Sequence, residues 1–379
     1  MQKAYFKLSS FYWFYFSALG AFIPYWGLYL KSLNFSASEI GELIAIIMAT
    51  KIIAPNLWGW LSDRSGKRLS LIRIGALMSC LFFSGIFLNN HYWWIFLILL
   101  SYSFFWNAIL PLFEALTLTY LGNDHHQYSY IRVWGSIGFV VTVFVLGLFF
   151  SRFSIEYLPW FNLLLLFGIF ISTVFVREKP IVHHEHHSRL RDLIKSSEVI
   201  VLLLACLLVQ MSHGPYYAFF SIFASEHQYS NTTIGLLWSL GVIAEVVIFL
   251  LMPRLILRFG LKKLLLFSLI SGSLRWLVIA FFIDYPWIIT INQLFHASTF
   301  GIYHIVVISL IHHYFKGKNQ GMGQALYSSV SFGIGGALGS LISGYLWNSM
   351  GPELTYVFAS IISLIAFMLS LMFIKYYPT

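Results

Sequence analysis

The segment "FEALTLTYLGNDHHQYSYIRVWGSIGF", Phe113 to Phe139, joins two apolar runs through a short polar turn. Each run is apolar enough to cross a membrane as a helix, yet the first contains Glu114 and the second contains Arg132. A lone charge at the centre of a membrane helix costs about 2.5 to 3.5 kcal/mol even on a lenient insertion scale. The two charges therefore need partners inside the membrane.

The composition places the whole chain, and not only this hairpin, in a membrane. Of 379 residues, 59% are hydrophobic, 19% aromatic and only 10% charged, a balance that no water-soluble monomer tolerates. Apolar runs of about 20 residues, the length of a membrane-crossing helix, recur along the chain. We predict an all-α membrane protein with twelve transmembrane helices at 9–30, 40–61, 69–89, 92–120, 130–151, 157–176, 198–223, 232–256, 262–282, 286–313, 322–348 and 354–374.

The distribution of Lys and Arg along the chain agrees with this predicted topology. The formal net charge is +9, and 18 of the 23 Lys and Arg residues lie at the termini or in loops after even-numbered helices. The positive-inside rule then places both termini in the cytoplasm, so the basicity needs no nucleic-acid partner. We expect a multi-pass protein of a bacterial inner membrane, surrounded by lipids, that binds a small molecule and functions as a monomer.

The longest polar stretch, residues 177–197, separates the first six predicted helices from the last six. We predict a cytoplasmic linker here, between an N-terminal half at 1–176 and a C-terminal half at 198–379. The halves share features at one offset of 197 residues, which indicates two pseudo-symmetric repeats. The matching residues are Gln127, Gly138 and Gly147 in the first half, and Gln324, Gly335 and Gly344 in the second.

Counting along the chain places the embedded charges at matching depths. Glu114 and Arg132 are each nine residues from the turn between their helices, which puts them level with each other. Glu245 and Arg275 are each fifteen residues from a turn near Gly260, so they form a second level-matched pair. Both pairs can be structural ion pairs that neutralise each other inside the bundle, or parts of a functional site.

One embedded cation, Lys51, has no carboxylate left to pair with. An ammonium group inside a helix bundle needs a ligand, water or loss of its proton. An anionic or strongly hydrogen-bonding substrate would supply that ligand. Trp134 and Phe139 lie close to Arg132 in the sequence and are the aromatic residues expected to contact such a ligand.

Two histidines lie in the tenth predicted helix, His296 and His304, where an imidazole can titrate near neutral pH and serve as a relay. Most other polar side chains inside the helices are expected to make interhelical hydrogen bonds. These are Asn107, Gln210, His213, Asn292 and Gln293.

The stretch "GWLSDRSGKR", residues 59–68, resembles the loop motif between helices two and three of the major facilitator superfamily. By this resemblance Gly59 allows close packing, Asp63 is the acid of the motif, and a basic cluster follows. The hairpin from Asn107 to Phe139 is similar to that of lactose permease, which implies that its Glu and Arg contact substrate. The loop motif comprises Gly59, Asp63, Arg64, Gly66, Lys67 and Arg68.

The order of "IRVWGSIGF", "SLRW" and "LFHASTFGIYH" looks still more like the phenylpropionate permease and nucleoside-symporter branch of that superfamily. Two residues depart from the lactose permease pattern. Thr299 stands where that family has its proton-carrying acid, and Phe139 stands where it has a sugar-stacking Trp. The resemblance therefore does not imply lactose specificity, and it moves the proton site to Glu245.

We predict a proton-coupled importer, a symporter of a small organic solute that works by alternating access. Three embedded cations and many aromatic rings favour an aromatic carboxylate as substrate. The expected substrate-binding residues are Lys51, Glu114, Arg132, Phe139 and His296, and the expected proton-coupling residues are Glu245, Arg275 and His296.

Three alternatives remain open from the sequence: an uncoupled exchanger or exporter, a nucleoside or sugar symporter, and a membrane enzyme or sensor. The enzyme is disfavoured because the predicted helices contain no paired catalytic acids and no nucleophile motif. We expect no cofactor other than the coupling proton and no metal. The histidine run from His183 to His187 is expected to be a solvated part of the linker.

Overall fold

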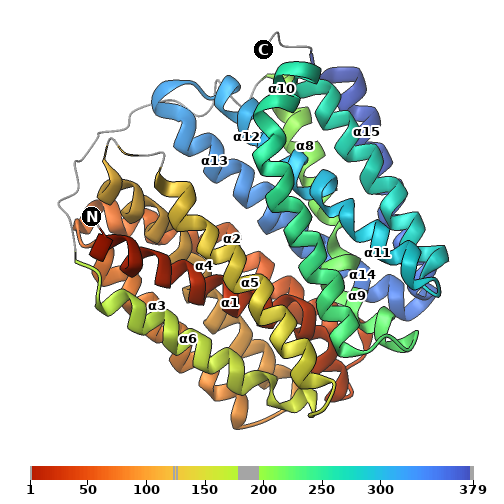
Figure 1. Cartoon of the computed structure of the whole chain (residues 1–379), viewed down its shortest axis with the longest axis horizontal. Helices are drawn as coiled ribbons and strands as arrows, with labels where there is room; N and C mark the ends of the chain where they lie inside the picture. Colours follow the sequence, from red (N-terminus) through yellow and green to blue (C-terminus); the bar gives the residue numbers. More distant parts are fainter. Residues whose placement is uncertain (1, 123, 125–126, 178–195, 376–379) are drawn as a thin grey trace. The chain divides into compact units, whose positions relative to one another are not determined.

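The computed structural model describes residues 2–122, 124, 127–177 and 196–375, and within them every regular element is a helix (Figure 1). Ten helices in this part of the chain are long and apolar enough to cross a membrane. One of them, α10 (Asn231–Phe282), has 52 residues and is broken at Gly260, so it covers two of the predicted spans. The all-α membrane class is thus supported, while the count of twelve and the cytoplasmic termini stay predictions.

Contacts divide the chain into two compact units, Met1–His184 with Tyr229–Ser239, and Glu185–Gln228 with Leu240–Thr379. The predicted histidine run at 183–187 lies outside the described residues. The helices before α10 in the first unit are α1 (Gln2–Ser32), α2 (Ala37–Ser65), α3 (Arg68–Ser84), η1 (Gly85–Phe87), α4 (Tyr92–Leu121), α5 (Tyr128–Phe150), η3 (Ile155–Tyr157) and α6 (Leu158–Val174).

The second unit contains most of α10 and two segments of π-helix, η4 (Ala297–Ile302) and η6 (Ser329–Gly335). Segments of π-helix inside α-helices are frequent at functional sites. The remaining helices of this unit are α8 (Ser197–Ser212), α9 (Gly214–Glu226), α11 (Pro286–Leu294), α12 (Tyr303–Tyr314), η5 (Gly317–Asn319), α13 (Gln320–Ser328), α14 (Gly336–Met350) and α15 (Pro352–Phe373).

Local sequence explains both ends of α2, which carries Lys51 and leads into the loop motif. Ser36 and Glu39 form a capping box at its start, with the Ser36 amide donating to Glu39 Oε2 at 2.8 Å. Gly66 ends the helix with φ 67°, and its amide donates to the Ser62 carbonyl at 3.0 Å. Glycine adopts this left-handed conformation without the strain that a side chain adds.

Glycines allow close helix crossings in both units. A Cβ added to Gly138 of α5 would lie 2.7 Å from the Trp13 carbonyl oxygen of α1. A Cβ added to Gly335 of η6 would lie 2.5 Å from the Leu207 carbonyl oxygen of α8. Only a residue without a side chain allows backbones to approach this closely. The two crossings involve corresponding helices, in keeping with the proposed repeat of the two halves.

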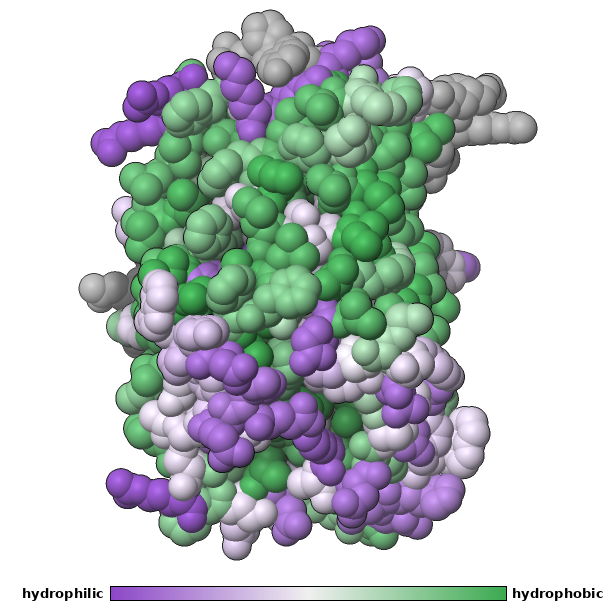
Figure 2. All heavy atoms as spheres, turned by 90° about the vertical axis from the view of Figure 1, so that its right-hand side faces the viewer, coloured by the Kyte–Doolittle hydropathy of each residue, from purple (hydrophilic) through white to green (hydrophobic). Residues whose placement is uncertain are grey.

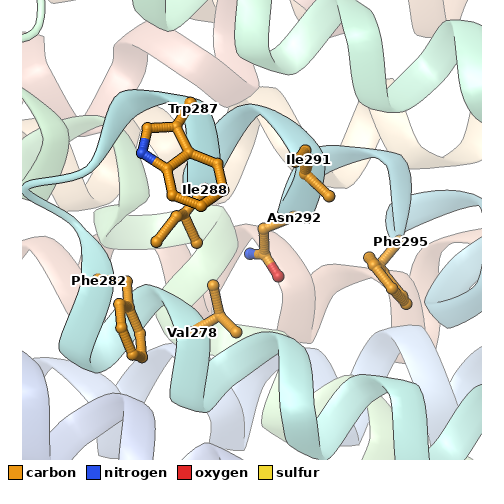
Figure 3. A pocket seen from close by; sticks show the side chains of 7 residues that line it. All are labelled: Val278, Phe282, Trp287, Ile288, Ile291, Asn292 and Phe295. Atoms are coloured by element: carbon orange, nitrogen blue, oxygen red, sulfur yellow. The ribbon is translucent and has the colours of Figure 1, made fainter.

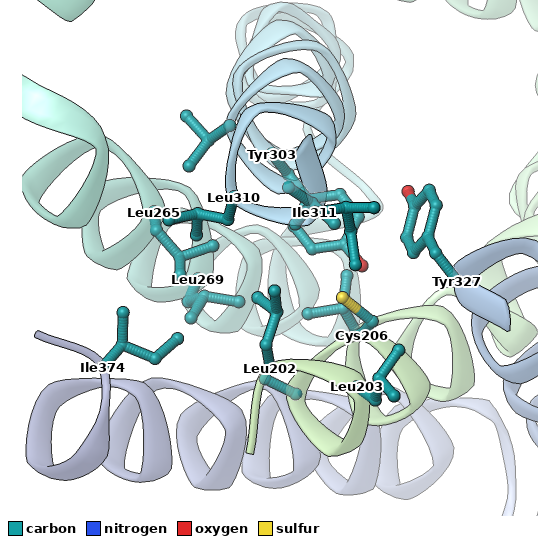
Figure 4. Close-up of a cluster of buried hydrophobic side chains, with 14 of the residues drawn as sticks. Leu202, Leu203, Cys206, Leu265, Leu269, Tyr303, Leu310, Ile311, Tyr327 and Ile374 are labelled. Carbon is teal, nitrogen blue, oxygen red and sulfur yellow. The ribbon is translucent and has the colours of Figure 1, made fainter. Parts of the chain in front are cut away.

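Apolar side chains fill the interior of each unit and also cover its outside. In the second unit Leu202 and Cys206 of α8 pack with Leu269 of α10 and Ile311 of α12 in a buried cluster (Figure 4). Figure 2 shows that hydrophobic residues cover much of the face in view, with hydrophilic residues gathered in patches. An outer surface of this kind suits a lipid environment rather than water.

Candidate functional site

The predicted contact between Glu114 and Arg132 is present in the first unit. Glu114 lies on α4 and Arg132 on α5, and Arg132 Nε is 3.9 Å from Glu114 Oε1. The side chains are 35% and 30% exposed, so neither charge is sealed inside the protein. A structural ion pair would be expected to be buried and fully hydrogen-bonded, whereas this pair keeps surface for a ligand.

Aromatic side chains that the sequence analysis did not single out surround this pair. The Arg132 guanidinium lies over the ring of Phe16 at 3.8 Å and near the ring of Tyr12 at 5.7 Å, both on α1. The Tyr128 hydroxyl donates to Glu114 Oε1 at 3.1 Å. Tyr128 precedes Arg132 by four residues and therefore shares its helix face, a spacing that the sequence already contains.

Lys51 lies half-buried on α2, beside a hydrogen-bonded contact between α2 and α4. Asn107 Nδ2 donates to Thr50 Oγ1 at 2.8 Å and to the Ile47 carbonyl at 2.9 Å, as predicted for interhelical polar groups. Among the described residues, no hydrogen bond or ion pair is found for the Lys51 ammonium group. The unit therefore holds one embedded cation that its own side chains do not neutralise.

Of the two aromatic residues predicted beside Arg132, Phe139 is buried and Trp134 is half-buried. Phe139 is only 6% exposed, and a Cβ on Gly20 would lie 2.8 Å from its carbonyl oxygen, so it belongs to the crossing of α1 and α5. Trp134 Nε1 donates to the Tyr5 hydroxyl at 2.8 Å. In this conformation Phe139 offers a ligand little surface.

The predicted level-matched pair of Glu245 and Arg275 lies around one imidazole, which contacts both side chains. Glu245 Oε2 is 3.5 Å from His296 Nε2, and Arg275 Nη1 is 3.2 Å from His296 Nδ1. A guanidinium only donates hydrogen bonds, so Nδ1 accepts and carries no proton. The hydrogen of the neutral ring is thereby assigned to Nε2, where it faces the carboxylate.

Arg275 is held by further contacts and is only 1% exposed. Its Nη1 donates to Thr299 Oγ1 at 2.9 Å, and its Nη2 donates to Gln293 Oε1 at 3.2 Å. Its guanidinium lies 4.3 Å from the centre of the Tyr216 ring. Thr299, at the position where the lactose permease resemblance expects an acid, thus acts as an acceptor for the arginine.

Residue spacing explains how two helices bring this network together. Gln293, His296 and Thr299 follow one another at intervals of three residues, so they face the same side. A Cβ on Gly241 of α10 would lie 3.3 Å from His296 Cβ, and Glu245 comes one turn later. The sequence contained this spacing, but counting from hairpin turns did not relate His296 to the two charges.

The loop motif forms a local network at the junction of α2 and α3. Arg68 Nη2 lies 3.9 Å from Asp63 Oδ1, and Arg68 also donates to Ser62 Oγ at 3.4 Å. The Arg64 guanidinium lies 5.4 Å from the Trp60 ring centre. At Gly59, which the resemblance assigned to close packing, no described atom lies within 4 Å of an added Cβ.

A separate pocket of about 300 Å³ opens beside the second network, between the end of the long α10 helix and α11 (Figure 3). Asn292 supplies an amide to its lining, and the Nδ2 of this amide donates to the Arg275 carbonyl oxygen at 3.4 Å. None of the predicted site residues lines it. The lining residues are Val278, Phe282, Trp287, Ile288, Ile291, Asn292 and Phe295.

Long apolar helices in two units, each with charged side chains held among them, define the chain as a multi-pass membrane protein of the transporter class. The model of the MFS_1 like family matches residues 5–358, so the chain belongs to this family of the major facilitator superfamily. The family and the relatives described below are transporters, not enzymes.

Two relatives cover nearly the whole chain. One is described as a probable 3-phenylpropionic acid transporter of Escherichia coli (strain K12), and is 30% identical over 364 residues, 92% of each chain. The maltose permease of Geobacillus stearothermophilus is 27% identical and covers 96% of this chain and 93% of the permease. A crystal structure of a mutant of the nucleoside transporter NupG shares the fold, with a TM-score of 0.88, 17% identity, and coverage of 98% of this chain and 100% of that one.

Proposed function

We propose that this chain imports a small aromatic carboxylate together with a proton, by alternating access, across the inner membrane of a bacterium. The observation that carries this proposal is the Lys51 ammonium group, which lies inside the first unit without a partner among the described residues. The relative from Escherichia coli supports it, because 3-phenylpropionic acid, which that protein is described as transporting, is an aromatic carboxylate.

The first unit supplies the proposed substrate site. The predicted helices of this unit contain two embedded cations, Lys51 and Arg132, and one embedded carboxylate, Glu114, so a substrate carboxylate would balance their charges. The half-buried ring of Phe16, which already contacts the Arg132 guanidinium, offers a flat face for an aromatic group. Glu114 then fixes the position of Arg132 rather than binding the anion.

The second unit supplies the proposed proton site. Glu245 carries the proton, and His296 Nε2 lies 3.5 Å from its Oε2. Protonation of His296 at Nδ1 requires loss of the hydrogen bond from Arg275, so His296 positions the carboxylate and does not itself carry the proton. A conformational change that alters these contacts changes how tightly Glu245 holds its proton, which couples proton release to transport.

A nucleoside or sugar symporter is the second candidate. The hydroxyl of Tyr128 and the carboxylate of Glu114 form a hydrogen-bonding pair that also suits a substrate rich in hydroxyl groups. The likeness to the maltose permease over 96% of the chain favours the same alternative. In an uncoupled exchanger or exporter, the site in the first unit would bind the substrate, and the Glu245 network would have only a structural role.

Thermal unfolding of the purified protein in detergent, with a panel of added solutes, separates these candidates. We expect 3-phenylpropionate and related aromatic acids to raise the midpoint, because a ligand that binds only the folded state stabilises it. The neutral amide of the same acid serves as the matched control and should have little effect. Stabilisation by sugars or nucleosides alone would overturn the proposed substrate.

A further inference from the structure

The bend of α10 at Gly260 carries basic side chains that neither proposed site uses. Gly260 has φ 73°, a left-handed conformation that breaks the helix there. The chain has no Asp or Glu between Glu245 and Asp284, so the sequence on either side of the bend supplies no carboxylate to balance these charges. The basic residues are Arg254, Arg258, Lys262 and Lys263.

The two arginines lie on an apolar outer face of α10. Leu250 and Leu257 are seven residues apart, which is about two helical turns, and they are 78% and 75% exposed. Arg254 follows Leu250 by four residues, and Arg258 follows Arg254 by four, so both exposed arginines share this face. In a membrane protein, an exposed face of large apolar side chains contacts lipid. The arginines thus lie where this face reaches the end of the predicted span at 232–256.

The two guanidinium groups make no hydrogen bond or ion pair within the described part of the chain. The Arg258 guanidinium lies 5.3 Å from the ring centre of its neighbour Phe259. Lys262 is different, because its Nζ donates to the Leu371 carbonyl oxygen of α15 at 3.0 Å. This contact holds the bend beside the end of α15 within the second unit (Figure 1). The backbone at the bend is therefore tied down, while the two arginines keep their donors.

A charge on a lipid-facing helix surface is costly unless it reaches the headgroups or pairs with an anion. An arginine side chain can extend along apolar surface toward the headgroups, and its guanidinium binds two phosphate oxygens with a planar set of N–H groups. The positive-inside rule accounts for basic residues in a loop, but it does not require arginines on the lipid-facing surface of the helix itself. The surface here combines apolar side chains with unpaired guanidinium groups, as the two parts of a phospholipid require.

We propose that this face of α10 binds an anionic phospholipid. Arg254 and Arg258 hold the phosphate oxygens of the headgroup, and the acyl chains lie along the apolar face that contains Leu250. The exposed Lys263 adds to the positive field at the bend. A headgroup with net negative charge fits better than a zwitterionic one, whose own cation would meet the basic side chains. A free phosphate ion would leave the adjoining apolar face without a partner.

Native mass spectrometry of the full chain, purified in detergent, tests this site with phosphatidylglycerol as the anionic probe and phosphatidylcholine as the matched lipid without net charge. We expect the wild type to bind phosphatidylglycerol at least about tenfold more tightly, and Arg254→Gln with Arg258→Gln to lose this preference. The control is Arg152→Gln with Arg177→Gln, which removes the same charge from exposed arginines of the first unit and should bind like the wild type.

A second variant separates charge from folding. Arg254→Lys with Arg258→Lys keeps both charges, so we expect it to retain most of the preference for phosphatidylglycerol, with a severalfold loss because an ammonium group lacks the planar donors. If the lysine variant binds as poorly as the glutamine variant, the positive charges are not the cause and the proposal is wrong.

Other outcomes also decide the matter, and none depends on transport, so they are independent of the proposed function. Equal binding of the two lipids by the wild type would overturn the site, as would an unchanged affinity of the glutamine variant for phosphatidylglycerol. Glycerol 3-phosphate, which has the phosphate but no acyl chains, should not displace the lipid at the same concentration. Displacement at that concentration would indicate a site for free anions rather than for a lipid.

Discussion

At the scale of single residues, the proposed balance between the embedded charges of the first unit and the substrate carboxylate depends on Lys51. We expect Lys51→Gln to weaken binding of 3-phenylpropionate by about 2 kcal/mol or more, since loss of one partner of a desolvated charge pair typically costs that much. This corresponds to roughly a thirtyfold rise in Kd. Isothermal titration of the purified variant measures it, with the neutral amide of the ligand as the control. Equal affinity of Lys51→Gln and wild type for the acid would contradict the role of Lys51.

The Arg275 side chain gives a second prediction at this scale. Its guanidinium donates to Thr299, Gln293 and His296 at once, and a lysine ammonium lacks the planar arrangement to do so. We expect Arg275→Lys to destabilise the protein by about 1.5 to 3 kcal/mol for each charged hydrogen bond lost. A thermal midpoint in detergent several degrees below that of the wild type is the expected readout. An unchanged midpoint would mean that these hydrogen bonds contribute little.

The two charge pairs show what the sequence can and cannot specify at this scale. Glu114 and Arg132 lie on adjacent helices of one hairpin, so equal depth was enough to predict their contact. Glu245 and Arg275 also share a depth, but depth says nothing about which way each side chain points around its helix. His296, from a third helix, occupies the space between them.

At the scale of elements, apolar run length predicted where helices lie, because a membrane sets the length that each helix needs. It did not predict their interruptions. The predicted seventh helix is split into α8 and α9 around His213, next to Pro215, and the tenth contains the π-helix η4. Proline lacks a backbone N–H and a π-helix changes the hydrogen-bond spacing, and hydropathy reports neither effect.

The crossing of α1 and α5 gives a prediction about stability. In Gly138→Leu the new Cβ would lie 2.7 Å from the Trp13 carbonyl oxygen, so the helices must separate. We expect a destabilisation of about 1 to 3 kcal/mol, as for other overpacked sites. Thermal unfolding in detergent measures it, and Gly59→Ala, where a Cβ meets open space, should unfold at or above the wild-type midpoint. If Gly138→Leu unfolds like Gly59→Ala, the crossing is not close-packed in the membrane protein.

At the scale of the whole molecule, the chain presents two units with different chemistry. The first contains Lys51, which has no partner among the described residues, and a partly exposed ion pair. The second contains a carboxylate linked through an imidazole to a buried arginine. Our proposal is that the first unit binds the substrate and the second binds the proton. The apolar composition was sufficient to predict the membrane class, and the embedded charges predicted this division between the halves, whereas the contacts of His296 with both Glu245 and Arg275 became visible only from the structure.

Uptake of labelled 3-phenylpropionate into proteoliposomes under an imposed proton gradient tests the central claim most directly. We predict that the wild type accumulates the label only when the gradient is present and that Glu245→Gln, which cannot release a proton, loses this accumulation. Glu156→Gln, at an exposed carboxylate in η3, should behave like the wild type. Gradient-dependent accumulation by Glu245→Gln at the wild-type level would contradict the account.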